Sequence, residues 1–231
     1  KRCIENGLTH LKVTGGEPFA SREFLDLLEW CDKNNYTEQL GLSITTNGTK
    51  YNKSLLKKLV KFNYLSLVVS VDGTNKIYDY IRQGTSWEKL NKNCELFDSF
   101  FESKKEKFRK HNNTIHIATV LQFYNVFDIG NLVNWCVQKG YILKVDVNLK
   151  PNDSELQVKY LPKELKEEVI KYCDQYIDKY RAIDWAYNSL SSVRNYMLQN
   201  IEVGNVNKQI ELKNTVLLQD KQYCTNYKDY L

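Results

Sequence analysis

VTGGEP, residues 13–18, is the stretch that decides the fold predicted for this chain. It follows a short apolar run, 8–13, and precedes an amphipathic helix expected to begin near Ser21. Two glycines at a strand-to-helix turn let the backbone bend sharply and let a ligand approach the bare main chain. Glu17 adds a negative charge, and Pro18 stiffens the exit. The turn therefore suits a cationic group, although an ordinary turn followed by an N-cap at Ser21 explains the same residues.

Strand and helix patterns alternate along most of the chain. Five predicted strands, each followed by a helix, indicate a parallel sheet with right-handed crossovers. The segment 209–218 is interpreted as a strand or an extended arm, and 151–155 is the nearest approach to a domain boundary. The predicted strands cover 8–14, 40–46, 64–71, 114–121 and 142–149, and the predicted helices cover 22–34, 53–62, 87–104, 128–139, 162–180 and 187–200.

The composition is that of a soluble globular protein of one large domain or two small ones, with 231 residues, 42% hydrophobic and 26% charged. The net charge is +5, but the lysines are scattered among acids. The densest basic stretch, 104–110, is interpreted as a solvated helix end and loop, with nucleic-acid or membrane-surface contact as the alternative. No apolar run approaches the ~20 residues of a membrane span, and no signal peptide is visible. We therefore expect a cytoplasmic protein without nucleic-acid or membrane partners.

The six cysteines lie far apart and form no CxxC pair, so neither a zinc site nor a disulfide framework is indicated. Cys31, Cys94, Cys136 and Cys173 fall in helical patterns beside apolar residues, which predicts buried free thiols. Residues 1–7 are typical of the tail of a helix closed by a glycine. The chain does not open with methionine, and its other end has no terminator character. A fragment cut at both ends is expected.

Polar side chains gather where the predicted strands end. In parallel α/β sheets this edge is where ligands bind. Each piece has a plain structural explanation, such as a turn at Asn47-Gly48 or at Asp72-Gly73. Together they supply an acidic, carbonyl-rich turn and also a serine and an arginine for a carboxylate, which is what a zwitterionic amino-acid moiety requires. The residues are Gly15, Gly16, Glu17, Asn47, Ser70, Asp72, Arg82, Gln122, Asn125 and Asn148.

The motifs VTGGEPFAS, ITTNGT and SVDGTNKIYDYIRQGTSWEKL, in this order, resemble those of radical S-adenosylmethionine (SAM) enzymes. The later stretch TVLQFYNVFDIGNLVNW is similar to the branch with a C-terminal twitch-type extension. The resemblance covers about 8–162 and is specific, because four motifs agree in order and spacing. It implies an α/β fold, a partial (β/α)6 TIM-like barrel that lacks its first strand. Residues 1–155 would form the barrel core, and 156–231 a helical extension leading toward an incomplete twitch-type region.

The resemblance also implies roles for the residues at the strand ends. Gly15, Gly16 and Glu17 would hold the amino group of the methionine moiety of SAM. Ser70 and Arg82 would hold its carboxylate. Asp72 would lie near the ribose or the substrate, and Asn47, counted with this cofactor-binding set, and Asn148 would lie along the barrel mouth.

In this family a [4Fe-4S] cluster donates one electron to SAM, and the resulting 5′-deoxyadenosyl radical abstracts a hydrogen from the substrate. The barrel's part is to position the reactants and exclude water. The expected partners are a small-molecule or peptide substrate and a flavodoxin- or ferredoxin-like electron donor.

One departure from the family pattern is serious. The CxxxCxxC loop that holds the cluster is absent from this sequence, and Cys224, near the expected twitch region, lacks partner cysteines. We therefore expect the cluster ligands on a segment upstream of Lys1 and no metal ligands within these residues. A cluster-free scaffold or partner-binding relative is the alternative. An unrelated α/β barrel with a phosphate or sugar ligand ranks last, because the Gly-rich phosphate signature at a helix N-terminus is missing.

Overall fold

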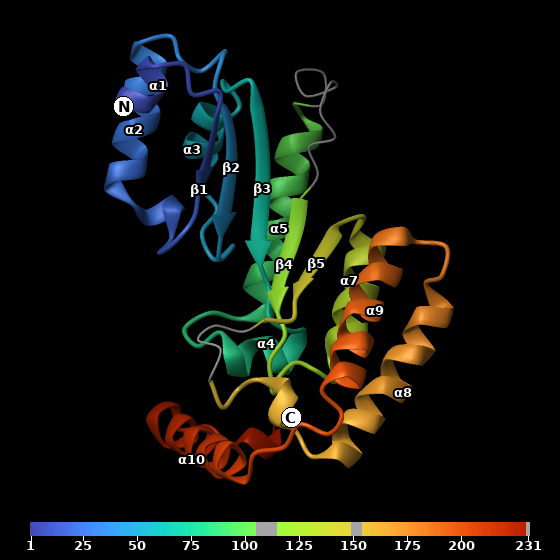
Figure 1. Cartoon of the computed structure of the whole chain (residues 1–231). Coiled ribbons are helices and arrows are strands. Elements are labelled where there is room, and N and C mark those ends of the chain that lie inside the picture. Colours follow the sequence, from blue (N-terminus) through green and yellow to red (C-terminus); the bar gives the residue numbers. More distant parts are fainter. Residues whose placement is uncertain (105–114, 149–153, 230–231) are drawn as a thin grey trace. The chain divides into compact units, whose positions relative to one another are not determined.

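The structure is a computed structural model that describes residues 1–104, 115–148 and 154–229 (Figure 1). Five strands form one sheet whose order follows the chain, β1-β2-β3-β4-β5. β1 pairs in parallel with β2, and β2 with β3. This architecture confirms the predicted α/β class and the five predicted strands. Their bounds are β1 (His10–Val13), β2 (Gly41–Thr46), β3 (Tyr64–Ser70), β4 (Ile115–Val120) and β5 (Ile142–Asp146).

The chain divides into two compact units, each described here by itself. The first unit holds 1–70 and 88–116, and the second holds 71–87 and 117–231. The boundary near residue 155 that separates a barrel core from an extension stays a prediction. The basic stretch from 105 onward and most of 151–155 lie outside the described residues.

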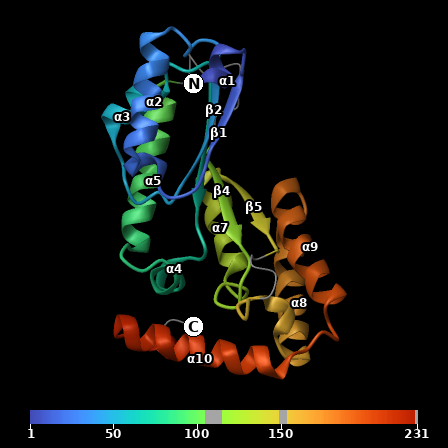
Figure 2. The same cartoon turned by 60° about the vertical axis from the view of Figure 1, so that its left-hand side comes forward.

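In the first unit, α2 (Arg22–Lys33), α3 (Lys53–Leu59) and most of α5 (Trp87–Glu102) lie on one face of β1, β2 and β3 (Figure 2). The unit also contains α1 (Arg2–Glu5) and a short 3-10 helix, η1, at Pro18–Ala20. The Ser21 side chain accepts a hydrogen bond from the Phe24 amide, so the predicted N-cap of α2 is confirmed. Apolar side chains from the strands and helices meet in a core that includes Leu28, Ile44, Leu56 and Phe97.

The second unit packs helices around β4 and β5. α8 and α9 pack on each other, and α9 also contacts β5. Gly140 ends α7 with a φ of 72°, a left-handed conformation that favours glycine. The helices are α4 (Asn75–Ile81), α7 (Ile129–Lys139), α8 (Lys163–Lys179), α9 (Asp184–Gln199) and α10 (Val206–Tyr223), with 3-10 turns at Val158–Tyr160 and Tyr227–Asp229.

Two local predictions differ from the structure, and one helix was not predicted. The segment 209–218, expected as a strand or extended arm, lies inside helix α10, so that prediction was wrong. Asn205 caps this helix by accepting from the Lys208 amide, and only Val216 is buried along it, which leaves little apolar periodicity to read. Helix α4 was not anticipated. Pro162 lies at the N-cap of α8, one position before the first helical residue where it was expected.

The predicted burial of Cys31, Cys94, Cys136 and Cys173 is confirmed, with each at most 1% exposed. None of the helices in the described part of the chain combines the length and the apolar character needed to cross a membrane.

Candidate functional site

The turn after β1 takes its shape from two glycines. Gly15 and Gly16 have φ values of 89° and 55°, which are strained for residues with a side chain. A Cβ built at either position would meet no atom within 4 Å. The backbone conformation therefore requires glycine here, and the space over the main chain is open to a ligand.

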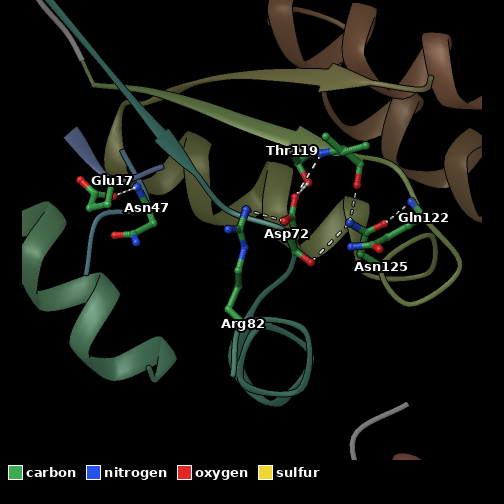
Figure 3. Close-up of polar contacts among 8 residues, drawn as sticks. Glu17, Asn47, Asp72, Arg82, Thr119, Gln122 and Asn125 are labelled. Carbon is green, nitrogen blue, oxygen red and sulfur yellow. Dashed lines mark hydrogen bonds and ion pairs between the residues drawn. The ribbon is translucent and has the colours of Figure 1, made fainter. Parts of the chain in front are cut away.

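Glu17 fastens this turn to the end of β2. Its Oε1 accepts hydrogen bonds from the Phe19 amide at 3.0 Å and from Thr46 Oγ1 at 2.7 Å. Its Oε2 accepts from the Asn47 amide at 2.8 Å, the contact drawn in Figure 3. All three partners donate, so the ionised carboxylate suits them. The structure thus brings Glu17 and Asn47 together and fixes a negative charge beside the exposed glycines.

Asn47 lies in a loop that is held by several hydrogen bonds. Its Oδ1 accepts from the Thr49 amide at 2.9 Å and from Thr49 Oγ1 at 2.8 Å. Gly48 has a φ of 69°, and a Cβ there would lie 2.7 Å from side chains of Val69 and Leu90. Buried Asn93 donates to the Gly48 carbonyl at 2.8 Å. The carbonyl oxygen of the Asn47 side chain is therefore committed to its own turn.

In the second unit, Asp72 and Arg82 form an ion pair. The Nη2 atom of Arg82 lies 2.6 Å from Oδ2 of Asp72 (Figure 3). The other oxygen of Asp72 accepts from the Val120 amide at 3.1 Å and from Thr119 Oγ1 at 3.3 Å. Asp72 is 8% exposed. One of its oxygens is bonded to the end of β4, and the other contacts the guanidinium of Arg82. The sequence did not anticipate Thr119 or Val120, because strand residues give no polar motif.

One hydrogen-bond donor of Arg82, its Nε–H, has no acceptor among the described residues. Arg82 lies at the C-cap of α4, and its Nε atom is buried. Buried donors without an acceptor are rare in folded proteins. An arginine grips a carboxylate through two N–H groups that point the same way. Because Asp72 is paired through Nη2, the Nε–H is a guanidinium donor that this ion pair does not use.

For two further predicted residues, Ser70 and Asn148, the structure shows a position but no hydrogen bond with the other predicted site residues that it describes. Ser70 is the last residue of β3 and is half-buried. Asn148 lies beyond β5, exposed, and its amide donates to Asp146 at 2.9 Å. The structure thus brings together Glu17 with Asn47 in the first unit, and Asp72 with Arg82 in the second. Their roles in binding stay predictions.

These features define an α/β protein with a glycine-glycine-glutamate turn and an arginine whose buried Nε has no partner among the described residues. A model of the Radical SAM superfamily matches residues 1–123, more than half of the chain. The chain belongs to the radical SAM superfamily. No curated protein matches this sequence.

Several solved structures are similar to this chain. Streptococcus suis SuiB bound to S-adenosylmethionine matches 78% of this chain with 18% identity and a TM-score of 0.50. Native anSMEcpe with bound AdoMet and Cp18Cys peptide matches 78% with 21% identity and a TM-score of 0.48. A domain of the pyruvate-formate lyase-activating enzyme from Bacteroides vulgatus matches 72% with 14% identity and a TM-score of 0.44. The match spans 38% of the SuiB chain, 49% of the anSMEcpe chain and 93% of the third.

The cysteines of this chain do not fit an iron–sulfur cluster. Such clusters are held by several thiolates at one place. In the ranges that the structure describes, no group of three or more His, Cys, Asp or Glu side chains is arranged to hold a metal ion. Four of the six cysteines are buried on separate helices, and Cys3 and Cys224 are exposed.

Proposed function

We propose that this chain is the SAM-binding core of a radical SAM enzyme. The observation that carries the proposal is the buried, unpartnered Nε of Arg82 in a chain of this superfamily. SAM carries an α-carboxylate that an arginine can bind and an α-ammonium group that a carboxylate and backbone carbonyls can bind. Arg82 would take the carboxylate, with Ser70 as a second donor. Gly15, Gly16 and Glu17 would take the ammonium group.

The complete protein, in this proposal, uses a [4Fe-4S] cluster, whose chemistry when bound is to supply the electron for reductive cleavage of SAM. The product radical abstracts hydrogen from a substrate. The cluster ligands lie outside the described residues, and a flavodoxin- or ferredoxin-like protein in the cytoplasm donates the electron. The resemblance to the twitch-type branch favours a peptide as the substrate, with a small molecule as the alternative.

SAM affinity tests the binding part of the proposal. Calorimetric titration of the complete protein should give a dissociation constant that Arg82→Ala weakens by at least about tenfold, because a charge-assisted pair contributes about 1.5–3 kcal/mol. Arg22→Ala is the matched control, since that side chain is 86% exposed and pairs with Asp26 on the same helix. Equal affinities for wild type and Arg82→Ala would remove Arg82 from the site.

A cluster-free SAM-binding scaffold is the second candidate, favoured by the absence of a cluster-ready cysteine group in the described residues. Anaerobic iron and sulfide analysis of the reconstituted complete protein separates the two. About four irons per chain, with 5′-deoxyadenosine formed under dithionite, would support the enzyme. SAM binding without iron and without cleavage would support the scaffold.

A further inference from the structure

We propose that Asn125 and Asp128, in the loop after β4, are positioning residues that hold the Asp72–Arg82 pair in the geometry that binds the SAM carboxylate. The inference rests on the proposed function. Neither residue is expected to touch SAM. Each acts on the turn 72–74, which connects β3 to helix α4 and thereby to Arg82 at the end of that helix.

Asn125 holds the first residue of the turn. It is 2% exposed, and its Nδ2 donates to the carbonyls of Asp72 at 3.3 Å and Val120 at 2.9 Å. Its Oδ1 accepts from the Gln122 amide at 2.9 Å (Figure 3). All three bonds go to main-chain groups. A buried side chain that satisfies three main-chain groups fixes their relative positions, here the start of the turn and the end of β4.

Asp128 holds the last residue of the turn. It is 3% exposed, and its carboxylate accepts from the Thr74 amide at 2.5 Å and from Thr74 Oγ1 at 3.0 Å. Asn131 donates to the same carboxylate at 2.9 Å. Thr74 lies at the N-cap of α4, where its hydroxyl would ordinarily accept from the helix, yet no side-chain cap is formed. The hydroxyl is turned toward Asp128 instead, 54 residues along the chain.

The turn needs this support because its own conformation is unusual. Gly73 between the two anchored residues has a φ of 146°, and a Cβ there would lie 2.7 Å from Ile77 Cγ2. A glycine hinge of this kind has many alternative conformations. Anchoring both flanking residues removes them, and α4 then leaves the turn in one direction. Arg82, one residue past the end of that helix, returns to Asp72 at the start of the turn.

A double-mutant cycle separates positioning from plain structural support. SAM affinity of the complete protein is measured for Asn125→Ala and Asp128→Asn, each in the wild-type and Arg82→Ala backgrounds. Both variants should weaken SAM binding roughly five- to thirty-fold beside a native Arg82 and less than about twofold without it. Asn134→Ala is the control. It loses side-chain bonds to Tyr180 and Lys179 in the same unit, away from the turn, and should leave SAM affinity unchanged.

The same measurements define failure. Unchanged affinity in both variants, or an equal loss with and without Arg82, would overturn the positioning role and leave the proposed function intact. Wild-type protein that fails to bind SAM would overturn both. If Asn125→Ala does not fold by circular dichroism, the nearly isosteric Asp128→Asn decides the question alone. The Arg82 Nε–H resonance in ¹⁵N spectra gives a second readout: it should shift and exchange faster in either positioning variant and stay unchanged in Asn134→Ala.

Discussion

Arg82 Nη2 lies 2.6 Å from Oδ2 of Asp72, while Arg82 Nε is buried without an acceptor among the described residues. The ion pair thus uses one donor of the guanidinium and leaves the Nε–H without an acceptor; in the proposed function that donor binds the SAM carboxylate. The exposed fractions of the side chains are 31% for Arg82 and 11% for Asp72, so solvent partly screens the attraction. The ion pair therefore matters more for orienting Arg82 than for stability.

Asp72→Asn should lower SAM affinity by about tenfold while changing stability little. The amide keeps the shape of the carboxylate but loses the charge that orients Arg82, and partly exposed ion pairs contribute little to folding. Isothermal titration and thermal melting of the same preparation measure the two effects. A variant that binds SAM as tightly as wild type would show that Arg82 is oriented by other contacts.

Glu17→Gln should destabilise the protein by about 1–3 kcal/mol. The carboxylate accepts from Phe19, Thr46 and Asn47, and a glutamine amide would turn a donor toward one of these donors. Urea unfolding measures the loss. Glu38→Gln is the control, because Glu38 is exposed in the same unit. Equal midpoints for Glu17→Gln and Glu38→Gln would show that the turn does not depend on the charge.

Much of the fold was readable because the signals are local. The cap at Ser21 depends on a residue three positions away, and the glycine that ends α7 depends on the helix before it. The prediction was wrong for helix α10. Its buried contacts involve Tyr80 and Tyr124, far away in sequence, and its own apolar residues are spread around the helix, so no periodic stripe marks it.

The candidate site also combines local features, which the sequence reveals, with contacts between distant residues, which it does not. The glycine turn and the polar residues at the strand ends can be recognised from the sequence as a candidate binding edge. The residues that they contact cannot, because those lie far away in the chain: Thr46 is 29 residues from Glu17, and Val120 is 48 residues from Asp72. The support from Asn125 and Asp128 also required the structure, because α4 was not predicted and the anchored turn precedes it. Sequence reading therefore located candidate residues but not the contacts that orient them.

Stability should fall as the pH drops from 7 toward 5, in part through His116. Burial lowers the pKa of its imidazole below the ordinary 6.5, so the folded protein holds the neutral ring more strongly than the unfolded chain does. This contribution is present above the unfolded pKa and is lost as the pH falls through the folded pKa. His116→Gln should flatten that part of the Tm profile. Parallel profiles for wild type and His116→Gln would refute the assignment.

Lys166→Met should lower stability by about 1–2 kcal/mol, or the Tm by roughly 2–8 °C. Lys166 is fully buried, and its ammonium donates to the carbonyl of Asn200, the C-cap of α9, at 2.8 Å, and to the carbonyl of Val203 in the segment that follows. Methionine fills the same space but leaves both carbonyls without this donor. Lys171→Met, exposed on the same helix, is the control for calorimetry. An unchanged Tm in Lys166→Met would mean that water replaces the ammonium at no cost.

Iodoacetamide should modify two of the six cysteines in the native protein and all six after denaturation. Cys3 and Cys224 are exposed, whereas the other four are at most 1% exposed. Reaction requires the thiolate, and burial raises the pKa of Cys173 to about 12, so access and ionisation both oppose its alkylation. Mass spectrometry of intact protein counts the adducts. Early modification of Cys173, on the inner face of α8, would mean that α8 and α9 separate readily, since their packing is what excludes the reagent.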